Sequence, residues 1–299
     1  MYDLIIIGSG VAGLGAAIYA RRFGMKTLVL GEAEGGTIIL THLVENYPGT
    51  KSLSGFALAQ NLLEHARGLG AEIQAAKVEK IEPAGKFFRV RVGEKEFETK
   101  TIIIATGTEH RKLEAKGAAE FENRGVSYCA TCDAPFYKGK TVALVGGSDS
   151  AVKESLIAAE HAAKVFILYR GQQLLAEPIN LQRMAAKKNI EPRCCGEIVE
   201  VFGKEKVEGV RLDNGTEIKL DGVFIEIGRI PRSELAKDLG IALNAKGEIK
   251  IDRFARTNVP GIFAAGDVTD ADWKQAITGV AEGAHAAHEA FEFLNSHNV

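Results

Sequence analysis

Short apolar runs, glycine-rich turns and segments of helical spacing alternate along the chain. Residues 3–7 form a β-branched apolar run, the turn GSGVAG occupies 8–13, and the apolar positions of 14–22 repeat with helical spacing. Another apolar run follows at 27–30. This order predicts a strand, a tight turn, a helix and a parallel strand, which together form one mononucleotide-binding unit.

The same order returns in the middle of the chain. Residues 141–145 are apolar, the turn GGSDSA occupies 146–151, a helical segment covers 152–163, and another apolar run covers 164–168. Two nucleotide-binding units in one chain predict two bound nucleotides, and a flavin with a nicotinamide is the simplest pair.

The remaining segments extend this pattern to the whole chain. Alternating positions at 71–92 and 96–101 predict sheet strands, and Asn214-Gly215 between the apolar runs 207–212 and 217–220 predicts a hairpin. Further elements are expected as strands at 222–228 and 262–267 and a long helix at 275–294. The predicted fold class is α/β, with two Rossmann-like three-layer dinucleotide-binding domains.

The first glycine turn has a structural context that favours nucleotide binding. A GxGxxG turn alone is a weak signal, but here a strand precedes it and a helix follows. Gly8 is expected to make the tight turn, Gly10 to let the backbone approach a pyrophosphate, and Gly13 to let helix and strand pack closely. Glu32 ends the next apolar run, where an acid binds a ribose hydroxyl.

Composition and charge narrow the classes of function. The chain has 299 residues, 46% of them hydrophobic and 25% charged, which is typical of a globular protein of about two domains. A net charge of -2 offers no basic surface, so no nucleic-acid partner is expected. The sequence has no apolar run of about 18 residues and no basic leader, so we expect a cytoplasmic protein without a membrane partner. His285 and His288 lack a third ligand, so no metal site is expected.

The four cysteines stand in two pairs. Cys129 and Cys132 form a CxxC motif, which either holds a redox-active disulfide or supplies half of a zinc site. Zinc needs two more ligands at a compatible spacing, and Cys194 and Cys195 are adjacent and distant in sequence, so the redox interpretation is favoured. A disulfide between neighbours strains the backbone, so Cys194 and Cys195 are expected to be thiols without a catalytic part.

Several motifs, in order along the whole chain, carry a family resemblance. They are GSGVAG at 8–13, ENYPG at 45–49, IATG at 104–107, CATCD at 129–133, PGIFAAGDV at 260–268 and KQA at 274–276. On these motifs the chain closely resembles the low-molecular-weight thioredoxin reductases. The resemblance implies an FAD-binding domain of residues 1–112 and 242–299, and an inserted NAD(P)-type domain of residues 113–241 that carries the CxxC. It also implies a homodimer, and a rotation of the inserted domain that presents the nicotinamide and the dithiol to the flavin in turn.

The resemblance also implies roles for individual residues. Cys132 would receive electrons from the flavin, Cys129 would attack the disulfide of thioredoxin or of a thioredoxin-like (glutaredoxin-like) protein, and Asp133 would protonate the leaving thiolate. Without the family, a turn residue before Ala-Pro is the alternative interpretation of Asp133. The FAD would contact Gly8, Gly10, Ala12, Gly13, Glu32, Gly36, Thr37, Asn46, Ala105, Thr106, Gly107, Gly266, Asp267, Lys274, Gln275 and Ala276.

The chain departs from the family at both nucleotide units. Thr37 follows Gly35-Gly36 where the family usually has Gln, and the loop before it is a residue short, which bears on the contacts of Glu32 and Thr37. In the second unit, Ser148 replaces a glycine, and its Cβ would crowd a pyrophosphate. NADPH-dependent members carry His-Arg-Arg and a further Arg, whereas this chain reads YRGQQLL at 169–175. The residues expected at this site are Gly146, Gly147, Ser148, Asp149, Ser150 and Arg170.

The electron donor therefore has more than one candidate. NADPH or NADH, used weakly or broadly, comes first, and a reduced ferredoxin or a deazaflavin comes next. A reductase for a disulfide protein other than thioredoxin is a third enzymatic alternative. A flavin-containing redox sensor or binding protein is the alternative from another class, but it has no need for the intact CATCD.

Overall fold

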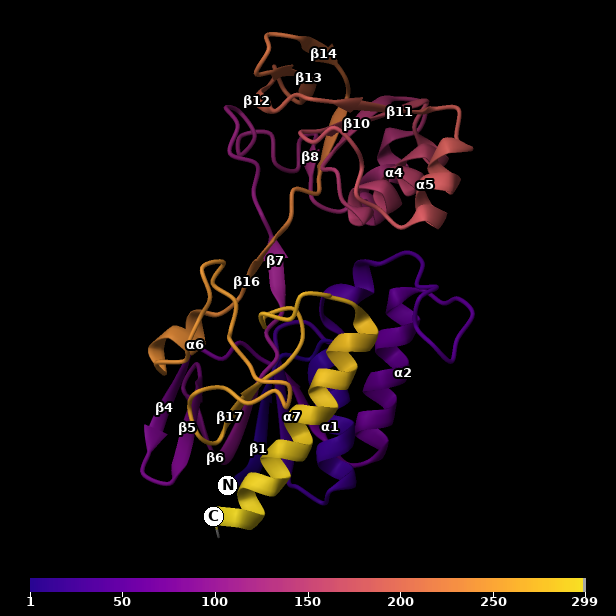
Figure 1. Ribbon diagram of the computed structural model, residues 1–299. Coiled ribbons are helices and arrows are strands. Elements are labelled where there is room, and N and C mark those ends of the chain that lie inside the picture. Colours follow the sequence, from indigo (N-terminus) through magenta and orange to yellow (C-terminus); the bar gives the residue numbers. More distant parts are fainter. Residues whose placement is uncertain (298–299) are drawn as a thin grey trace. The chain divides into compact units, whose positions relative to one another are not determined.

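The structure is a computed structural model that describes residues 1–297, and the chain divides into two units. Unit 1 contains Met1–Glu109 and the chain from Ile230 onward, and unit 2 contains His110–Arg229. The chain leaves unit 1 through β7 (Thr108–His110) and returns through β16 (Arg229–Pro231), and these strands pair with each other (Figure 1). The fold is mixed α/β with two Rossmann-like domains, one interrupting the other in sequence. Which nucleotide each domain binds stays a prediction at this point.

Unit 1 is built on one mixed sheet. Its strands, in spatial order, are β3 (Glu72–Ala75), β2 (Thr27–Gly31), β1 (Tyr2–Ile7), β6 (Lys95–Ile104), β5 (Phe87–Val92) and β4 (Lys80–Ala84), and β17 (Ile262–Ala264) also pairs with β6. The pairs among β3, β2, β1, β6 and β17 are parallel, whereas β4 and β5 pair antiparallel. The first half of β6 pairs with β5 and its last residues pair with β17. The turns after β1, β2, β6 and β17 therefore lie at one edge of the sheet.

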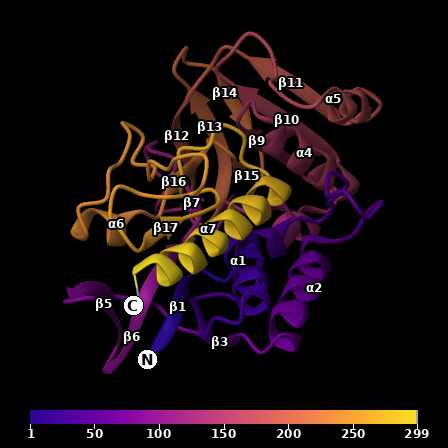
Figure 2. The ribbon, with the colours of Figure 1, turned by 60° about the horizontal axis from the view of Figure 1, so that its bottom comes forward.

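Three helices of unit 1 lie on one face of this sheet (Figures 1 and 2). They are α1 (Val11–Arg22), α2 (Gly55–Gly68) and α7 (Ala276–His297); η1 (Gly36–Leu40) and α6 (Glu234–Asp238) are short. Leu4 and Ile6 of β1 are buried with α1 and α7, whereas Ile5 and Ile7 are buried on the opposite face, because successive strand residues point to opposite sides. α1 and α7 pack so closely that a Cβ on Gly283 would lie 2.1 Å from the carbonyl oxygen of Ala12.

Unit 2 contains a parallel sheet and a smaller antiparallel sheet. The parallel sheet has the order β11 (Ile190–Cys194), β10 (Lys164–Tyr169), β9 (Thr141–Val145), β15 (Gly222–Ile225) and β8 (Val126–Ser127). The antiparallel sheet contains β12 (Ile198–Gly203), β13 (Val207–Leu212) and β14 (Glu217–Lys219). The helices are α3 (Ala130–Asp133), η2 (Ala134–Tyr137), α4 (Asp149–His161) and α5 (Pro178–Ala185).

The predicted elements of both nucleotide units are confirmed. β1, α1 and β2 form the first, and β9, α4 and β10 form the second. The predicted hairpin is also confirmed, since β13 and β14 pair antiparallel and Gly215 has φ 83°. The sequence pattern predicts no element at 55–68, where α2 begins after Ser54, whose hydroxyl accepts a hydrogen bond from the Ala57 amide at 3.1 Å. Among residues 1–297, no helix is both long and apolar enough to cross a membrane.

Candidate functional site

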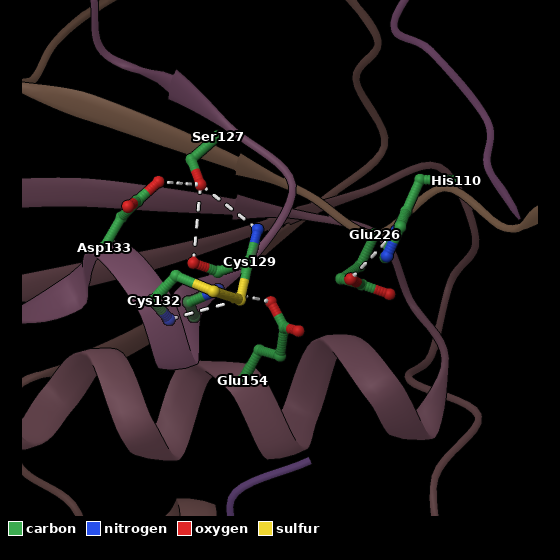
Figure 3. Close-up of a disulfide and its surroundings, with 8 residues drawn as sticks. His110, Ser127, Cys129, Cys132, Asp133, Glu154 and Glu226 are labelled. Atoms are coloured by element: carbon green, nitrogen blue, oxygen red, sulfur yellow. Dashed lines mark hydrogen bonds and ion pairs between the residues drawn. A yellow bond between two sulfur atoms is a disulfide. The ribbon is translucent and has the colours of Figure 1, made fainter. Parts of the chain in front are cut away.

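The CxxC pair lies between β8 and α4 in unit 2 (Figure 3). Cys129 and Cys132 form a disulfide whose Cα atoms are 5.3 Å apart. Cys129 is also the N-cap of α3, because its Sγ accepts a hydrogen bond from the Cys132 amide at 3.2 Å. Cys132 is exposed and Cys129 is half-buried. The one-turn helix thus holds both sulfurs at its start.

Asp133 and Ser127 form a second connection to the disulfide loop. Sequence reasoning predicted a role for Asp133 but missed Ser127. The Ser127 hydroxyl lies 2.6 Å from Oδ2 of Asp133, and it accepts a hydrogen bond from the Cys129 amide at 3.1 Å. Ser127 therefore links the carboxyl group to the backbone of the first cysteine (Figure 3). The only sequence signal is the position of Ser127 two residues before the CxxC motif.

Glu154, Glu226 and His110 lie on the other side of the disulfide (Figure 3). They belong to none of the sequence motifs. Glu154 of α4 accepts a hydrogen bond from the Ala130 amide at 3.2 Å, and Glu226 follows β15. Burial, together with the charge of Glu226, raises the pKa of Glu154 to about 8, and burial raises the pKa of Glu226. Nδ1 of His110 lies 3.5 Å from Oε1 of Glu226, and burial lowers the pKa of His110 to about 4. The histidine is therefore neutral near pH 7 and forms no ion pair there.

The first glycine turn is closed by backbone contacts. Gly8 has φ 114°, and a Cβ there would lie 2.0 Å from the Ala105 carbonyl oxygen. A Cβ on Gly13 would lie 1.9 Å from the Gly8 carbonyl oxygen. At Gly10 the nearest atom to a Cβ is Cα of Gly36, at 3.9 Å, and Gly10 is the N-cap of α1 without a side-chain cap. The amides that begin α1 are thus left for a phosphate, as this type of turn requires.

The sixteen residues expected around FAD all lie in unit 1, most of them at the sheet edge where the parallel strands end. Gly8 to Gly13 follow β1, Glu32 follows β2, Gly36 and Thr37 lie in η1, Ala105 to Gly107 follow β6, Gly266 and Asp267 follow β17, and Lys274 to Ala276 lead into α7. Asn46 joins this set because its Nδ2 donates to Oε1 of Gln275 at 3.0 Å. The fold therefore gathers segments from both ends of the chain.

Lys274 and Glu282 stabilise the loop after β17. The Lys274 ammonium is paired with Glu248 and donates to the carbonyl oxygens of Asp267 and Thr269 at 2.9 and 3.0 Å. Glu282 of α7 accepts a hydrogen bond from the Gly266 amide at 2.7 Å. Sequence reasoning missed Glu282, which lies on α7 far from the GD motif in sequence.

The second glycine turn keeps its backbone form although it carries Ser148. Gly146 has φ 144°, and a Cβ there would lie 2.1 Å from the Glu226 carbonyl oxygen. Ser148 is exposed and is the N-cap of α4, without a side-chain hydrogen bond to the helix. Asp149 points to α5 instead, because its Oδ1 accepts from the Glu177 amide at 3.0 Å and from Asn180 at 2.9 Å. Ser150 is exposed one residue further on.

The strand end after β10 differs from a typical phosphate-binding site. Nη1 of Arg170 lies 3.0 Å from Oε1 of Glu197, and both side chains are exposed. Cys194 and Cys195 lie at the end of β11, which pairs with β10. The expectation that they are separate thiols is wrong, because their sulfurs form a vicinal disulfide. The left-handed backbone of Cys195, with φ 69°, accommodates the pairing of neighbours that the sequence argument considered too strained.

One of the two dinucleotide-binding folds carries a disulfide, and Ser127 links the Asp133 carboxyl to it. This combination defines a disulfide oxidoreductase. Residues 2–289 match the pyridine nucleotide-disulphide oxidoreductase family, and the chain belongs to that family. It is therefore an oxidoreductase acting on sulfur groups, and the family implies FAD and a pyridine nucleotide.

Similar proteins point the same way. The chain is 38% identical to thioredoxin reductase of Listeria monocytogenes, over 98% of this chain and 94% of that protein. The crystal structure of Lactococcus lactis thioredoxin reductase matches with a TM-score of 0.96 and 40% identity, covering 99% of this chain and 100% of that one. A ferredoxin-flavin thioredoxin reductase from Clostridium acetobutylicum matches with a TM-score of 0.54 and 34% identity, covering 99% of this chain and 98% of that one. These likenesses support a flavin-dependent disulfide reductase.

Proposed function

We propose that this protein passes electrons through FAD to the Cys129–Cys132 disulfide, and from there to the disulfide of thioredoxin or a thioredoxin-like protein. The observation that carries the proposal is the disulfide itself, held at the start of α3 and linked through Ser127 to Asp133. A purely structural disulfide needs no such acid. Thioredoxin as the partner is supported by the names of the relatives.

Unit 1 fits the FAD that the family implies. A Cβ on Gly10 would find no protein atom nearer than 3.9 Å, so the turn leaves the close approach that a pyrophosphate needs. The first amides of α1 would hold the phosphates, and Glu32 would accept from a ribose hydroxyl. Asn46 and Gln275, which are hydrogen-bonded to each other, would both contact the FAD. When bound, FAD supplies two electrons to the disulfide.

The two cysteines then act in sequence. Reduction breaks the Cys129–Cys132 bond and consumes two electrons and two protons. The Cys129 thiolate attacks one sulfur of the partner's disulfide and forms a mixed disulfide, and Asp133 protonates the thiolate that leaves. Cys132 next attacks Cys129, which restores the internal disulfide and releases the partner with both sulfurs reduced. Ser127 orients Asp133 for this transfer, because its hydroxyl lies 2.6 Å from the carboxyl.

A groove beside Asp133 supports docking of a protein substrate. Ser127, Phe136 and Lys140 are among the residues that line it, and the Phe136 side chain is 75% exposed. Aromatic residues, Phe among them, are enriched in protein interfaces. The variant Phe136→Ala should raise the KM for thioredoxin about tenfold and leave reduction of a small aromatic disulfide unchanged.

A nicotinamide nucleotide is the first candidate for the donor, and reduced ferredoxin is the second. The intact turn at Gly146 and the uncapped start of α4 favour a nucleotide. The pairing of Arg170 with Glu197 leaves that arginine less available for a 2′-phosphate, and together with the likeness to the ferredoxin-flavin enzyme this favours the second candidate.

The donor is tested by anaerobic mixing of the holoenzyme with NADPH, NADH or reduced ferredoxin while the flavin absorbance is followed. Bleaching within seconds by either nucleotide supports the first candidate, and bleaching by ferredoxin alone supports the second. The whole proposal is tested by Cys132→Ser, which should abolish thioredoxin reduction, with Cys195→Ser as the matched control that retains it. The homodimer belongs to the same proposal and should give twice the chain mass of 32.1 kDa in light scattering.

A further inference from the structure

Two carboxyl groups face each other close to the disulfide, within unit 2. Glu154 rises from α4 toward the Cys129–Cys132 pair, and its Oε2 accepts from the Ala130 amide, next to Cys129 (Figure 3). Glu226 has a side chain only 4% exposed, and its charge helps burial to raise the pKa of Glu154, so the two carboxyl groups are near neighbours. Two neighbouring carboxylates repel each other when both are charged and buried, so the pair favours one bound proton.

The charged groups around Glu154 and Glu226 do not neutralise both acids in place of the proton. Arg229, after β15, favours ionisation of both acids. His110 faces Glu226 but is neutral near pH 7, since burial lowers its pKa to about 4. The positive charge of Lys112 helps to lower the pKa of His110. Asp133 is hydrogen-bonded to Ser127 on the opposite side of the loop. Among the described residues, Oε1 of Glu226 and Nδ1 of His110 have no hydrogen-bond partner although both are buried. The pair thus has one facing cation for two acids.

We propose that the Glu154–Glu226 pair is a proton-binding site whose occupancy is coupled to the redox state of the Cys129–Cys132 pair. With the proton bound, the two acids carry a single negative charge, and a thiolate at the start of α3 is tolerated. When the proton leaves, a second negative charge appears beside Ala130 and destabilises the thiolate, so that the disulfide becomes harder to reduce. Glu154 is a positioning residue in this scheme, acting on the cysteines through charge and through its hydrogen bond to the Ala130 amide. The inference rests on the proposed disulfide-reductase function.

The redox step balances without any further reactant. In dithiothreitol, the Cys129–Cys132 bond breaks and the two sulfurs of dithiothreitol form the new disulfide, while two electrons pass to the protein. Below the pKa of Glu154, which is about 8, the pair keeps its proton in both redox states. Above it, the oxidised protein has lost the proton, and the reduced protein, with a nearby thiolate, retains it to higher pH. The pair therefore takes up protons on reduction only in alkaline solution.

The variant Glu154→Gln provides a matched test because glutamine keeps a carbonyl oxygen for the Ala130 amide and can never gain the second charge. The full-length holoprotein and the variant are equilibrated with oxidised and reduced dithiothreitol at a series of pH values, and free thiols are alkylated. Mass spectrometry of the tryptic peptide 125–138 then reports Cys129 and Cys132 apart from Cys194 and Cys195, which lie in another peptide.

The expected result is a pH-dependent ratio between the two proteins. The reduction equilibrium constant of Glu154→Gln should equal that of the unmodified protein near pH 6.5 and exceed it about tenfold near pH 9.5, the ratio that one pKa unit of coupling gives. A ratio that does not rise with pH overturns the inference, and a constant offset would indicate a structural role only. Peptide 125–138 that never oxidises reversibly would instead refute the proposed function.

A second variant keeps the test decisive if Glu154→Gln does not fold. In Glu226→Gln the repulsion on Glu154 is removed, so the pH at which reduction becomes harder should fall by about one unit. An unchanged inflection in this variant contradicts the coupling between the two acids.

Discussion

Replacing Gly8 by alanine should destabilise unit 1 far more than the same change at Gly24. Both glycines have a positive φ, 114° at Gly8 and 78° at Gly24. They differ in the space around them: a Cβ on Gly8 would lie 2.0 Å from the carbonyl oxygen of Ala105, whereas a Cβ on Gly24 would meet no atom within 4 Å. Gly24 is therefore the matched control for backbone strain without crowding.

The magnitude follows from adding the two effects. A side chain in a sparsely populated backbone region costs about 1–3 kcal/mol, and crowding in a packed site costs about 1–3 kcal/mol more. The crowding at Gly8 is against backbone, which cannot turn away, and it would separate β1 from β6, where the Ala105 amide donates to the Ile7 carbonyl at 2.7 Å. Gly8→Ala should thus cost about 2–6 kcal/mol and Gly24→Ala about 1–3 kcal/mol.

Urea unfolding followed by the fluorescence of Trp273 measures this difference, because Trp273 is the only tryptophan and belongs to unit 1. Flavin absorbance per chain gives an independent measure, and Gly8→Ala should retain little FAD whereas Gly24→Ala retains it fully. Equal unfolding free energies for the two variants, within about 0.5 kcal/mol, would refute the argument that Gly8 is required by its contact with Ala105.

Three further predictions concern unit 2. Asp133→Asn should lower turnover with thioredoxin at least about a hundredfold but spare an activated aromatic disulfide, whose leaving thiolate needs no proton; equal losses with both substrates would contradict the role as acid. Glu154, whose pKa burial raises to about 8 from 4.5, stabilises the fold fully below about pH 4.5 and loses that contribution as the pH rises through 8. Hydrogen exchange in β9 should therefore show that the stability of Glu154→Gln, relative to that of the unmodified protein, rises by on the order of 3–4 kcal/mol between pH 5 and 8. No rise would show that the carboxyl is not buried as described. Arg170→Ala should change the KM for NADPH by less than about threefold, since Arg170 is paired with Glu197 and not with the 2′-phosphate; a tenfold rise in steady-state assays would place the arginine on the phosphate.

Several site features could not be found in the sequence because their residues are brought together by strand pairing. Glu226 reaches the start of the second glycine turn only because β15 pairs with β9, so that the Glu226 amide donates to Val145 at 2.8 Å. Glu154 sits on the turn of α4 that faces Ala130, and nothing in its neighbourhood in sequence distinguishes it from the other acids of that helix. The same holds for Glu197, which meets Arg170 because β11 pairs with β10.

The sequence by itself determined the two nucleotide-binding units, the CxxC motif and the hairpin at Gly215. Each of these depends on residues close together in the chain, where apolar period, glycine position and spacing act directly on the local backbone. Only the tertiary structure decided that Ser127 contacts Asp133, that Glu154 and Glu226 are buried as neighbours, and that the neighbouring cysteines form a disulfide. These depend on side-chain distances across separate elements or on a single left-handed residue, and the register of the sheet and the local backbone angles fix such distances, which no periodic pattern encodes.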